Sequence, residues 1–165
     1  MRSVDVTVEI DEAGLPRGAT ATARIERPVA DVWKVVNEVE RYADRVPMMH
    51  RVRLKGDRAT VDLKFKIALF SVGFQFVVDV TKKQEESLEL RWVSGEPHGI
   101  LLKLELESIE DGAACQVRST GKFDPMSLGW LAKYFLKHHP EIQFGVMPGV
   151  AVGLLEAMRK ATLES

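Results

Sequence analysis

Few residues on the apolar side of the predicted strands could take part in chemistry. Three polar or nucleophilic residues occupy the same alternating positions as the apolar residues of their strands: His98, Ser119 and Cys115. Histidine titrates near neutral pH, so His98 could carry a proton or cap a polar group of a ligand, and a histidine in a surface turn is the alternative. Ser119 could orient a ligand hydroxyl or carbonyl, or be an ordinary strand serine. Cys115, near a hairpin, is expected to be a small buried apolar residue.

His138, His139 and Glu141 are the residues that most resemble a metal site. Adjacent histidines on a helix point about 100° apart, so they cannot share an ion without other ligands. No other Cys or His has ligand spacing, and the chain has no nucleophile-elbow, phosphate-loop or dinucleotide-binding glycine motif. An acid–base enzyme also needs ionisable groups that converge in its pocket. We therefore predict no metal, no cofactor and no catalytic residue.

The composition is that of an ordinary globular protein. Of the 165 residues, 45% are apolar, and the net charge of -1 gives no support for DNA binding. The single cysteine excludes a disulfide within the chain. The N-terminus is unlike a signal peptide, and the uncharged stretch from Ile142 to Leu155 is too short and too rich in glycine to span a membrane. We expect one cytoplasmic domain over residues 1–165, and nothing in the composition indicates an oligomeric state.

Hydrophobic periodicity divides the first third of the chain into strands and helices. Val4 to Ile10 and Ala21 to Ile25 alternate apolar and polar residues with period 2, as strands do. After Pro28 the apolar spacing becomes i, i+3, i+4 and i+7 in two consecutive segments that end at Pro47. This pattern predicts two short helices after the second strand.

Period 2 returns from Val52 to Phe123, in five or six consecutive strands on short turns, with a break at Gly73. Strands joined in this way form an antiparallel meander. Met126 to Lys137 and Pro140 to Leu163 are helical in pattern, and Pro148 could kink the second helix. The order of elements predicts an α+β protein whose helices are segregated from an antiparallel sheet.

One phase of the meander carries almost no charge. The acids and bases lie on the other phase, which is expected to face solvent. The apolar phase is either the lining of a ligand cavity or a packed core under the last helix. Our candidate ligand-binding residues on this phase are Phe65, Phe76, Trp92, His98, Leu102, Leu104, Val117 and Ser119. Because few of them are ionisable, the pattern favours binding over catalysis.

Small residues recur every four positions in the last helix, as Gly145, Gly149, Gly153, Ala157 and Ala161. Positions four apart lie nearly above one another, so these residues form one stripe. Glycine inside a helix costs about 1 kcal/mol relative to alanine, so the stripe needs a reason. It is either a seam of close packing or a wall of the cavity, and we include Gly149 and Gly153 among the candidate ligand-binding residues.

Two further segments could contact partners. Trp130 and Phe135, on a weakly basic predicted helix, could touch a membrane transiently or pack against the sheet as ordinary core. A basic patch alternates along two neighbouring strands: Arg51, Arg53, Lys55, Lys64 and Lys66. It is either a solvated sheet face or a contact for RNA, an acidic partner or lipid head groups.

The segment ATARIERPVADVWKVVNEVERYADRVP, residues 21–47, resembles the opening of the START-like superfamily. A strand ends at a proline, a helix with Asp31 and Trp33 follows, and Glu40-Arg41-Tyr42 leads to a second proline before the next strand. The resemblance is to the polyketide cyclase/dehydrase-like lipid-binding branch and the coenzyme-Q-binding-like branch. The arrangement of elements extends it over about residues 17–163.

The resemblance implies a helix-grip fold. A curved antiparallel sheet of about six to seven strands would wrap around a long C-terminal helix and enclose a hydrophobic cavity, with two short helices after an early strand. The strand at residues 2–10 lies outside this pattern, as an addition or an early edge strand.

Three functions follow as hypotheses. The main prediction is a non-enzymatic protein that binds or carries a hydrophobic small molecule, such as a lipid, a polyketide-like ring system or a quinone. The first alternative is a polyketide aromatase/cyclase-type enzyme in which His98 and a few hydroxyls move protons. The second is a module that docks on a macromolecule, of the ribosome-associated START-like type.

Overall fold

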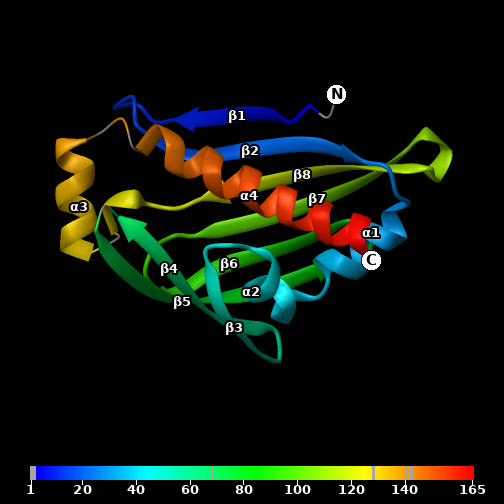
Figure 1. The fold of residues 1–165 in the computed structure, drawn as a ribbon, viewed down its shortest axis with the longest axis horizontal. Helices are drawn as coiled ribbons and strands as arrows, with labels where there is room; N and C mark the ends of the chain where they lie inside the picture. Colours follow the sequence, from blue (N-terminus) through cyan, green and yellow to red (C-terminus); the bar gives the residue numbers. More distant parts are fainter. Residues whose placement is uncertain (1–2, 68, 128, 140, 142) are drawn as a thin grey trace.

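The computed structural model describes residues 3–67, 69–127, 129–139, 141 and 143–165 (Figure 1). The strands are β1 (Asp5–Ile10), β2 (Pro16–Ile25), β3 (Met49–Lys55), β4 (Arg58–Ile67), β5 (Phe70–Lys83), β6 (Ser87–Gly95), β7 (Leu101–Ile109) and β8 (Ala114–Lys122). The helices are α1 (Val29–Val36), α2 (Tyr42–Arg45), α3 (Gly129–His138) and α4 (Gln143–Glu164), with 3-10 turns η1 (Val39–Arg41), η2 (Glu110–Gly112) and η3 (Pro125–Ser127).

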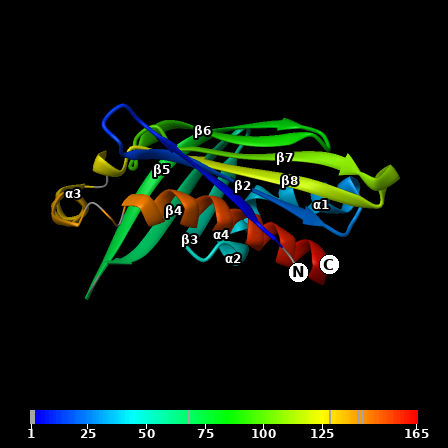
Figure 2. The same ribbon diagram turned by 90° about the horizontal axis from the view of Figure 1, so that it is seen from above.

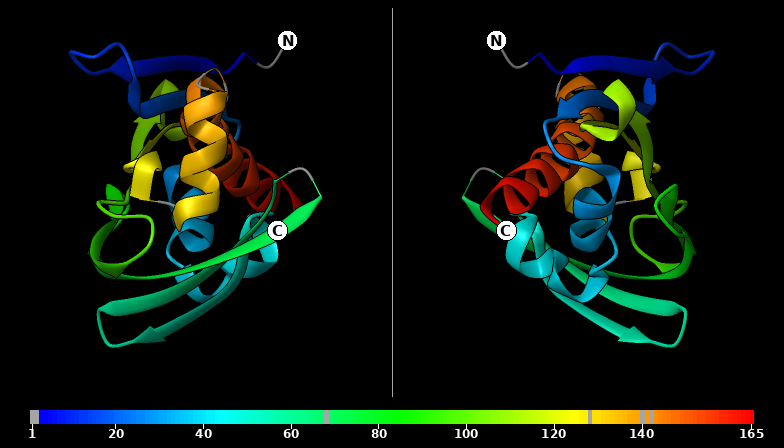
Figure 3. Two further views of the ribbon diagram at one scale, coloured as in Figure 1. Left: turned by 90° about the vertical axis from the view of Figure 1, so that its left-hand side faces the viewer. Right: turned by 90° about the vertical axis from the view of Figure 1, so that its right-hand side faces the viewer.

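The strands of the described residues form one eight-stranded antiparallel sheet in the order β1-β2-β8-β7-β6-β5-β4-β3. The meander predicted from period 2 therefore runs from β3 to β8, and β2 pairs with its last strand. The sheet curls around α4, which crosses its concave side (Figures 1, 2 and 3). This is the helix-grip fold that was predicted, with eight strands rather than six to seven. The N-terminal segment is an edge strand, because β1 pairs with β2 from Asp5 to Ile10.

Strand β4 ends at Ile67 and β5 begins at Phe70, so the chain turns between them and not at Gly73, where the sequence predicted a break. Gly73 lies inside β5, opposite Lys64 of β4. Leu69, predicted on the apolar side of a strand, lies in the turn with 99% of its surface exposed. The turn contains none of the usual Gly, Pro, Asn or Asp residues, so the sequence pattern could not locate it.

Helix α4 buries one side against the sheet and contacts β2 and β8. Its buried apolar side chains recur at spacings of three and four residues: Met147, Ala151, Leu154, Leu155, Ala157 and Met158. The approach to β8 is close, since a Cβ added at Gly121 would lie 3.0 Å from Cγ1 of Val150. Pro148 lies inside the helix, which continues to Glu164.

The two short helices are joined to each other by buried hydrogen bonds. The hydroxyl of Tyr42, which is fully buried, donates to the carbonyl oxygen of Val36 at 2.6 Å. Burial raises the pKa of the Tyr42 hydroxyl, so it stays protonated and acts as a donor. Nη1 of Arg45 donates to the carbonyl oxygen of Val35 at 2.9 Å. Helix α1 contacts α4 and α2 contacts β3, so this pair fixes the chain that leads into β3.

Candidate ligand-binding cavity

An apolar cavity of about 30 Å³ lies between the concave side of the sheet and α4. Its lining comes from the segment after α2, from five strands or strand ends and from α4: Val46, Met48, Met49, Leu63, Phe76, Pro97, Ile100, Leu102, Phe123, Val150 and Leu154. Each strand contributes the residues of its apolar phase, because period 2 sends alternate side chains to the same face of a sheet. The volume is about that of one water molecule, and a drug-sized ligand needs roughly 300 Å³ or more.

Phe76 and Leu102 are the predicted ligand-binding residues that line this cavity. Leu104 and Val117 lie on the predicted inward face and are completely buried in the core, outside the lining. The side chain of Phe65 lies outside the described part of the chain. The alternation thus identified the inward face of the sheet correctly, and the binding role of these residues stays a prediction.

Several lining residues were missed by the sequence prediction of the site. Leu63, Ile100 and Phe123 share the apolar phase of their strands, so the alternation contained the signal for them. Met48 and Met49 follow the short helices in a segment without a period, and only the fold brings them to the cavity. Methionine is unbranched and flexible, so these two side chains can change rotamer at low cost.

Ser119 is buried on the inward face without a hydrogen-bond partner. Its exposed fraction is 0%, and its Oγ has no partner among the described residues. It lies on β8 between Leu104 of β7 and Ala21 of β2, in the part of the sheet that α4 covers. A buried unsatisfied hydroxyl costs about 1–3 kcal/mol, so this group would gain from a polar atom of a ligand or from a water.

His98 and Trp92 lie together at the end of the molecule where β6 leads into β7. Their ring centroids are 5.4 Å apart, and Trp92 Nε1 donates to the carbonyl oxygen of Gly95 at 3.1 Å. His98 is exposed and Trp92 is partly buried. Pro97 and Ile100, on either side of His98, line the cavity. The loop that carries His98 therefore covers one end of the cavity, here named the cavity mouth, and His98 lies on its outer side.

Gly149 and Gly153 were expected to line the cavity or to form a close-packed seam. Neither residue forms a close-packed seam, and their role in ligand binding stays a prediction. A Cβ added at either residue would have nothing within 4 Å, and neither belongs to the lining. Gly149 is exposed. The buried side chains of α4 occupy the opposite side of the helix, because Leu154 and Leu155 point to the sheet. The glycines of the stripe therefore face away from the sheet, whereas Ala157 of the same stripe is buried in the core.

The cavity offers no acid–base chemistry from its own lining, because no lining residue among the described ones has an ionisable side chain. Cys115 is buried, as predicted, and burial raises the pKa of its thiol to about 11. A thiol with this pKa stays protonated at neutral pH and is a poor nucleophile. The geometry therefore supports binding and orienting an apolar molecule.

Comparison with known proteins assigns the family. Residues 25–156 match the family described as "Polyketide cyclase / dehydrase and lipid transport". The chain belongs to this family. The match covers most of the chain and confirms the resemblance seen in residues 21–47. No curated protein matches the sequence.

Solved structures with the same fold include an aromatase/cyclase and a START superfamily protein. The Zhui aromatase/cyclase from Streptomyces sp. R1128 is 16% identical over 88% of this chain and 93% of that chain, with a TM-score of 0.60. A START superfamily protein from Mycobacterium smegmatis is 9% identical over 90% and 98%, with a TM-score of 0.64. A conserved protein from Geobacillus kaustophilus is 16% identical over 90% and 96%, with a TM-score of 0.66. At these identities the likeness shows the fold.

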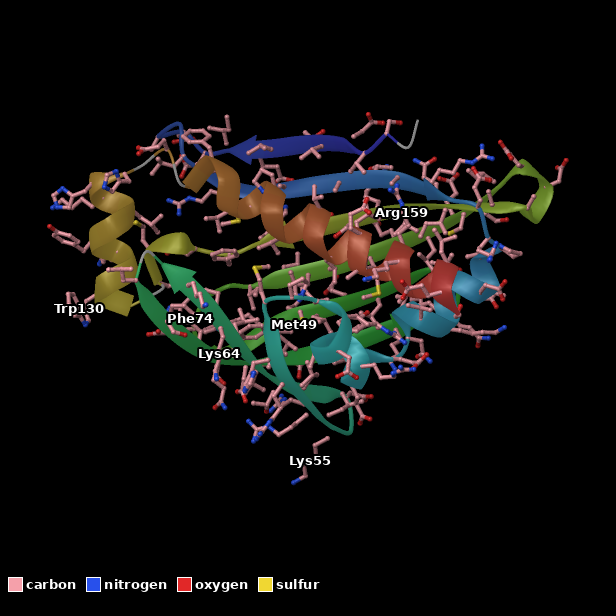
Figure 4. The ribbon with its side chains drawn as sticks, viewed as in Figure 1. Met49, Lys55, Lys64, Phe74, Trp130 and Arg159 are labelled. Atoms are coloured by element: carbon pink, nitrogen blue, oxygen red, sulfur yellow. The ribbon has the colours of Figure 1, made fainter. Side chains whose placement is uncertain are left out.

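A larger hollow of about 450 Å³ lies on this polyketide cyclase-like chain at the sheet edge, between β1, β2 and the end of α4. Its charged side chains are Asp5, Arg24, Glu26 and Arg159, and Arg24 forms an ion pair with Glu26. Arg159 lies between α4 and β2 (Figure 4) and its Nη1 donates to Glu156 at 2.8 Å. The open shape and the charged lining are typical of a polar surface groove, so the apolar cavity is the better candidate site.

The remaining predicted surface features lie on the outside of the molecule. No metal-binding cluster exists among the described residues, and His139 contacts Glu141 at 3.2 Å without further ligands. Trp130 is 80% exposed, so the interpretation of this residue as ordinary core was wrong. The side chain of Phe135 lies outside the described part of the chain. The basic patch is exposed on β3 and β4, where Arg53 lies 3.6 Å from Asp62. No helix within the described ranges is long and apolar enough to cross a membrane.

Proposed function

We propose that this protein binds a hydrophobic small molecule between the sheet and α4 and carries it without chemical change. The observation that carries the proposal is a wholly apolar lining, drawn from strands and α4 together, with no ionisable side chain among its described residues. The description of the family includes lipid transport. The lipid, polyketide-like and quinone-like classes named from the sequence are chemically compatible with such an apolar lining.

Ser119 lies outside the present lining of the cavity and would supply a polar anchor for a ligand that expands it. Its buried Oγ has no partner in the described chain, so a ligand hydroxyl or carbonyl that reached it would replace an unsatisfied group by a hydrogen bond. Apolar walls with one or a few placed polar groups are typical of small-molecule sites. We therefore propose that the cargo is mainly apolar and has at least one oxygen.

Binding requires that the cavity expand. At about 30 Å³ it holds no lipid, so lining side chains and the mouth must move. Met48 and Met49 supply flexible walls, and Pro97 and Phe123 mark the mouth. The free-energy cost of expansion is offset by the burial of apolar surface on binding, which contributes roughly 25 cal/mol per Å² removed from water.

The second candidate is an aromatase/cyclase-type enzyme, favoured by the fold shared with the Zhui aromatase/cyclase. In this protein the proton carrier would be His98, which lies at the mouth against Trp92. The carrier and enzyme hypotheses differ in the result of His98→Ala. The carrier predicts unchanged fold and nearly unchanged apolar binding, and the enzyme predicts loss of turnover of an identified substrate.

The test of the main proposal is native mass spectrometry of the purified protein, followed by titration with an apolar fluorescent probe. We expect a co-purified apolar molecule, or saturable probe binding that lipids or quinones reverse. Trp92 lies beside the mouth, so its fluorescence should report the titration. A variant with Ser119→Ala should lose affinity for an oxygen-bearing ligand and keep affinity for a hydrocarbon. A folded protein without saturable binding would refute the proposal.

A further inference from the structure

The exposed apolar side chains gather at one end of the molecule. Six large hydrophobic side chains are exposed among the described residues, and all but Val6 belong to elements that reach the end beyond the cavity mouth (Figures 1 and 3). They are Ile10 at the end of β1, Leu69 in the β4–β5 turn, Trp130 and Tyr134 on α3, and Phe144 at the start of α4. A cluster of this kind marks an interaction surface.

The two most exposed residues project from separate elements. Leu69 is 99% exposed in the β4–β5 turn, and Trp130 is 80% exposed on α3. Trp130 points away from the body of the protein (Figure 4). In the left view of Figure 3, α3 lies at the front of the molecule, and the adjoining ends of β4 and β5 lie to one side of it. Side chains that protrude from a hairpin tip and from a helix suit a flat, deformable interface better than a groove.

Lysines accompany these apolar residues. Lys133 and Lys137 are exposed on α3, whose sequence has no acidic residue, and Lys64 and Lys66 are exposed on β4 before the turn. The carboxylates of this end lie in the neighbouring loops and turns: Asp11, Glu12, Glu96, Asp124 and Glu141. Arg17 binds both Asp11 and Asp124, and His139 contacts Glu141. Apolar insertion is therefore the main force, with a modest contribution from anionic lipid near α3 and β4.

We propose that this end docks on a lipid bilayer, with Leu69 and Trp130 inserted at the interface and the α3 lysines at the head groups. Tryptophan and tyrosine have an apolar ring with a polar tip, and they favour the boundary between hydrocarbon and water. The cavity mouth lies at the same end, because Pro97 and Phe123 of the cavity lining lie in the loops there. Docking would place the mouth against the membrane from which an apolar cargo enters. This role rests on the proposed function.

The test is flotation of the full chain, free of cargo, with vesicles of phosphatidylcholine alone or with phosphatidylglycerol added. We expect wild type to float, and more strongly with phosphatidylglycerol. Trp130→Ala and Leu69→Ser should each weaken binding about tenfold or more, because each removes one inserted apolar side chain. Val6→Ser is the matched control, since Val6 is exposed on β1 outside the cluster, and it should bind as wild type does.

Two charge-reversal variants test the orientation of the docked protein on the vesicle. Lys133→Glu should weaken binding to the anionic vesicles and change binding to phosphatidylcholine little. Lys55→Glu makes the same charge change at the β3–β4 turn, away from α3 (Figure 4), and should leave both unchanged. The side chains at all five varied positions are exposed, so each variant should melt close to wild type, and a melting scan checks this.

The outcomes separate docking from cargo binding. A protein that never floats, even on anionic vesicles, refutes docking, and so does flotation that Trp130→Ala and Leu69→Ser leave unchanged. A dimer that Trp130→Ala dissociates, with no flotation, assigns the surface to a second copy of the chain and also refutes docking. Probe binding without vesicles should be equal in wild type and Trp130→Ala. Flotation without probe binding would refute the cargo proposal and keep the docking site.

Discussion

The backbone amide of His98 donates a hydrogen bond to the Ser127 hydroxyl at 2.7 Å. The same hydroxyl donates to the carbonyl oxygen of Asp124 at 2.6 Å, and the Asp124 amide donates to the carbonyl oxygen of His98 at 3.1 Å. These three bonds, here named the mouth latch, join the β6–β7 loop to the segment between β8 and α3. Cavity-lining residues flank the latch in both segments, so we expect the latch to stabilise the closed mouth.

Removing the Ser127 hydroxyl should loosen the mouth. Ser127→Ala deletes two of the three latch bonds, and because the site is exposed we expect a stability loss of about 1 kcal/mol or less. Amide hydrogen exchange at His98 should become faster, and an apolar probe should associate and dissociate faster with little change in affinity. Stopped-flow fluorescence and exchange measured by nuclear magnetic resonance check this.

Ser108→Ala is the matched control for the latch, because Ser108 is exposed near the far end of β7. It should leave probe kinetics and exchange at His98 unchanged. Equal kinetics in wild type and Ser127→Ala would mean that the ligand enters elsewhere.

Truncation of a cavity wall should separate stability from binding. Leu154→Ala and Leu88→Ala both remove a side chain that is 2% exposed or less, so each should lower the free energy of unfolding by about 2–5 kcal/mol. Leu154 lines the cavity and Leu88 does not. Only Leu154→Ala should therefore enlarge the cavity and admit a larger apolar probe. Urea melts and probe titrations decide, and identical binding by the two variants would contradict the assigned site.

The sequence predicted the fold and the inward face of the sheet better than the site itself. Period 2 is a local property, so it placed Phe76 and Leu102 on the correct face before any tertiary contact was known. Met48 and Met49 escaped prediction because their segment has no period and reaches the cavity only through the packing of α1 and α2. The unsatisfied state of Ser119 is likewise a tertiary property.

The direction of a helix face also depends on packing. Spacing showed that Gly149 and Gly153 share one stripe of α4, and it could not by itself show which stripe meets the sheet. The larger side chains Met147, Leu154 and Met158 define the opposite stripe, and their greater apolar surface decides the orientation. Comparing the two stripes in the sequence would have corrected the expectation.

The buried thiol of Cys115 should resist modification in the folded protein. Because burial raises its pKa from 9.0 to about 11, the thiolate fraction at pH 8 is about a hundredfold lower than in the unfolded chain. Reaction with a disulfide reagent should be correspondingly slow until denaturant is added. Rapid labelling of the folded protein would show that β8 opens locally.

The same shift has a defined sign for stability. The folded state disfavours the thiolate, and the unfolded chain ionises near pH 9, so this group costs nothing below pH 9 and destabilises the fold progressively from about pH 9 to pH 11. The difference in urea stability between wild type and Cys115→Ala should follow this range. A difference that is constant with pH would contradict the shifted pKa.

Arg159 is a buried cation with one ion-pair partner in the described chain. Its side chain is 7% exposed, Nη1 bonds Glu156, and Nε is buried without a partner. Replacing such a charge by an apolar side chain of similar length is often neutral or stabilising, so Arg159→Met should change stability by about 1 kcal/mol or less, or raise it. Glu156→Gln removes the partner and should destabilise by about 1 kcal/mol. If urea melts show that Arg159→Met is less stable than Glu156→Gln, Arg159 takes part in a stabilising network.

The outward glycine stripe should accept side chains without strain. Gly149→Ala places a Cβ in open space and reduces the entropy of the unfolded chain, so it should stabilise by about 0.5–1 kcal/mol and leave probe binding unchanged. Gly121→Ala is the contrasting variant, because its Cβ would meet the Val150 side chain at 3.0 Å and push α4 from β8. It should destabilise by about 1–3 kcal/mol. Paired thermal melts and probe titrations test both variants. If Gly149→Ala melts at a lower temperature or binds the probe more weakly, Gly149 does not face outward.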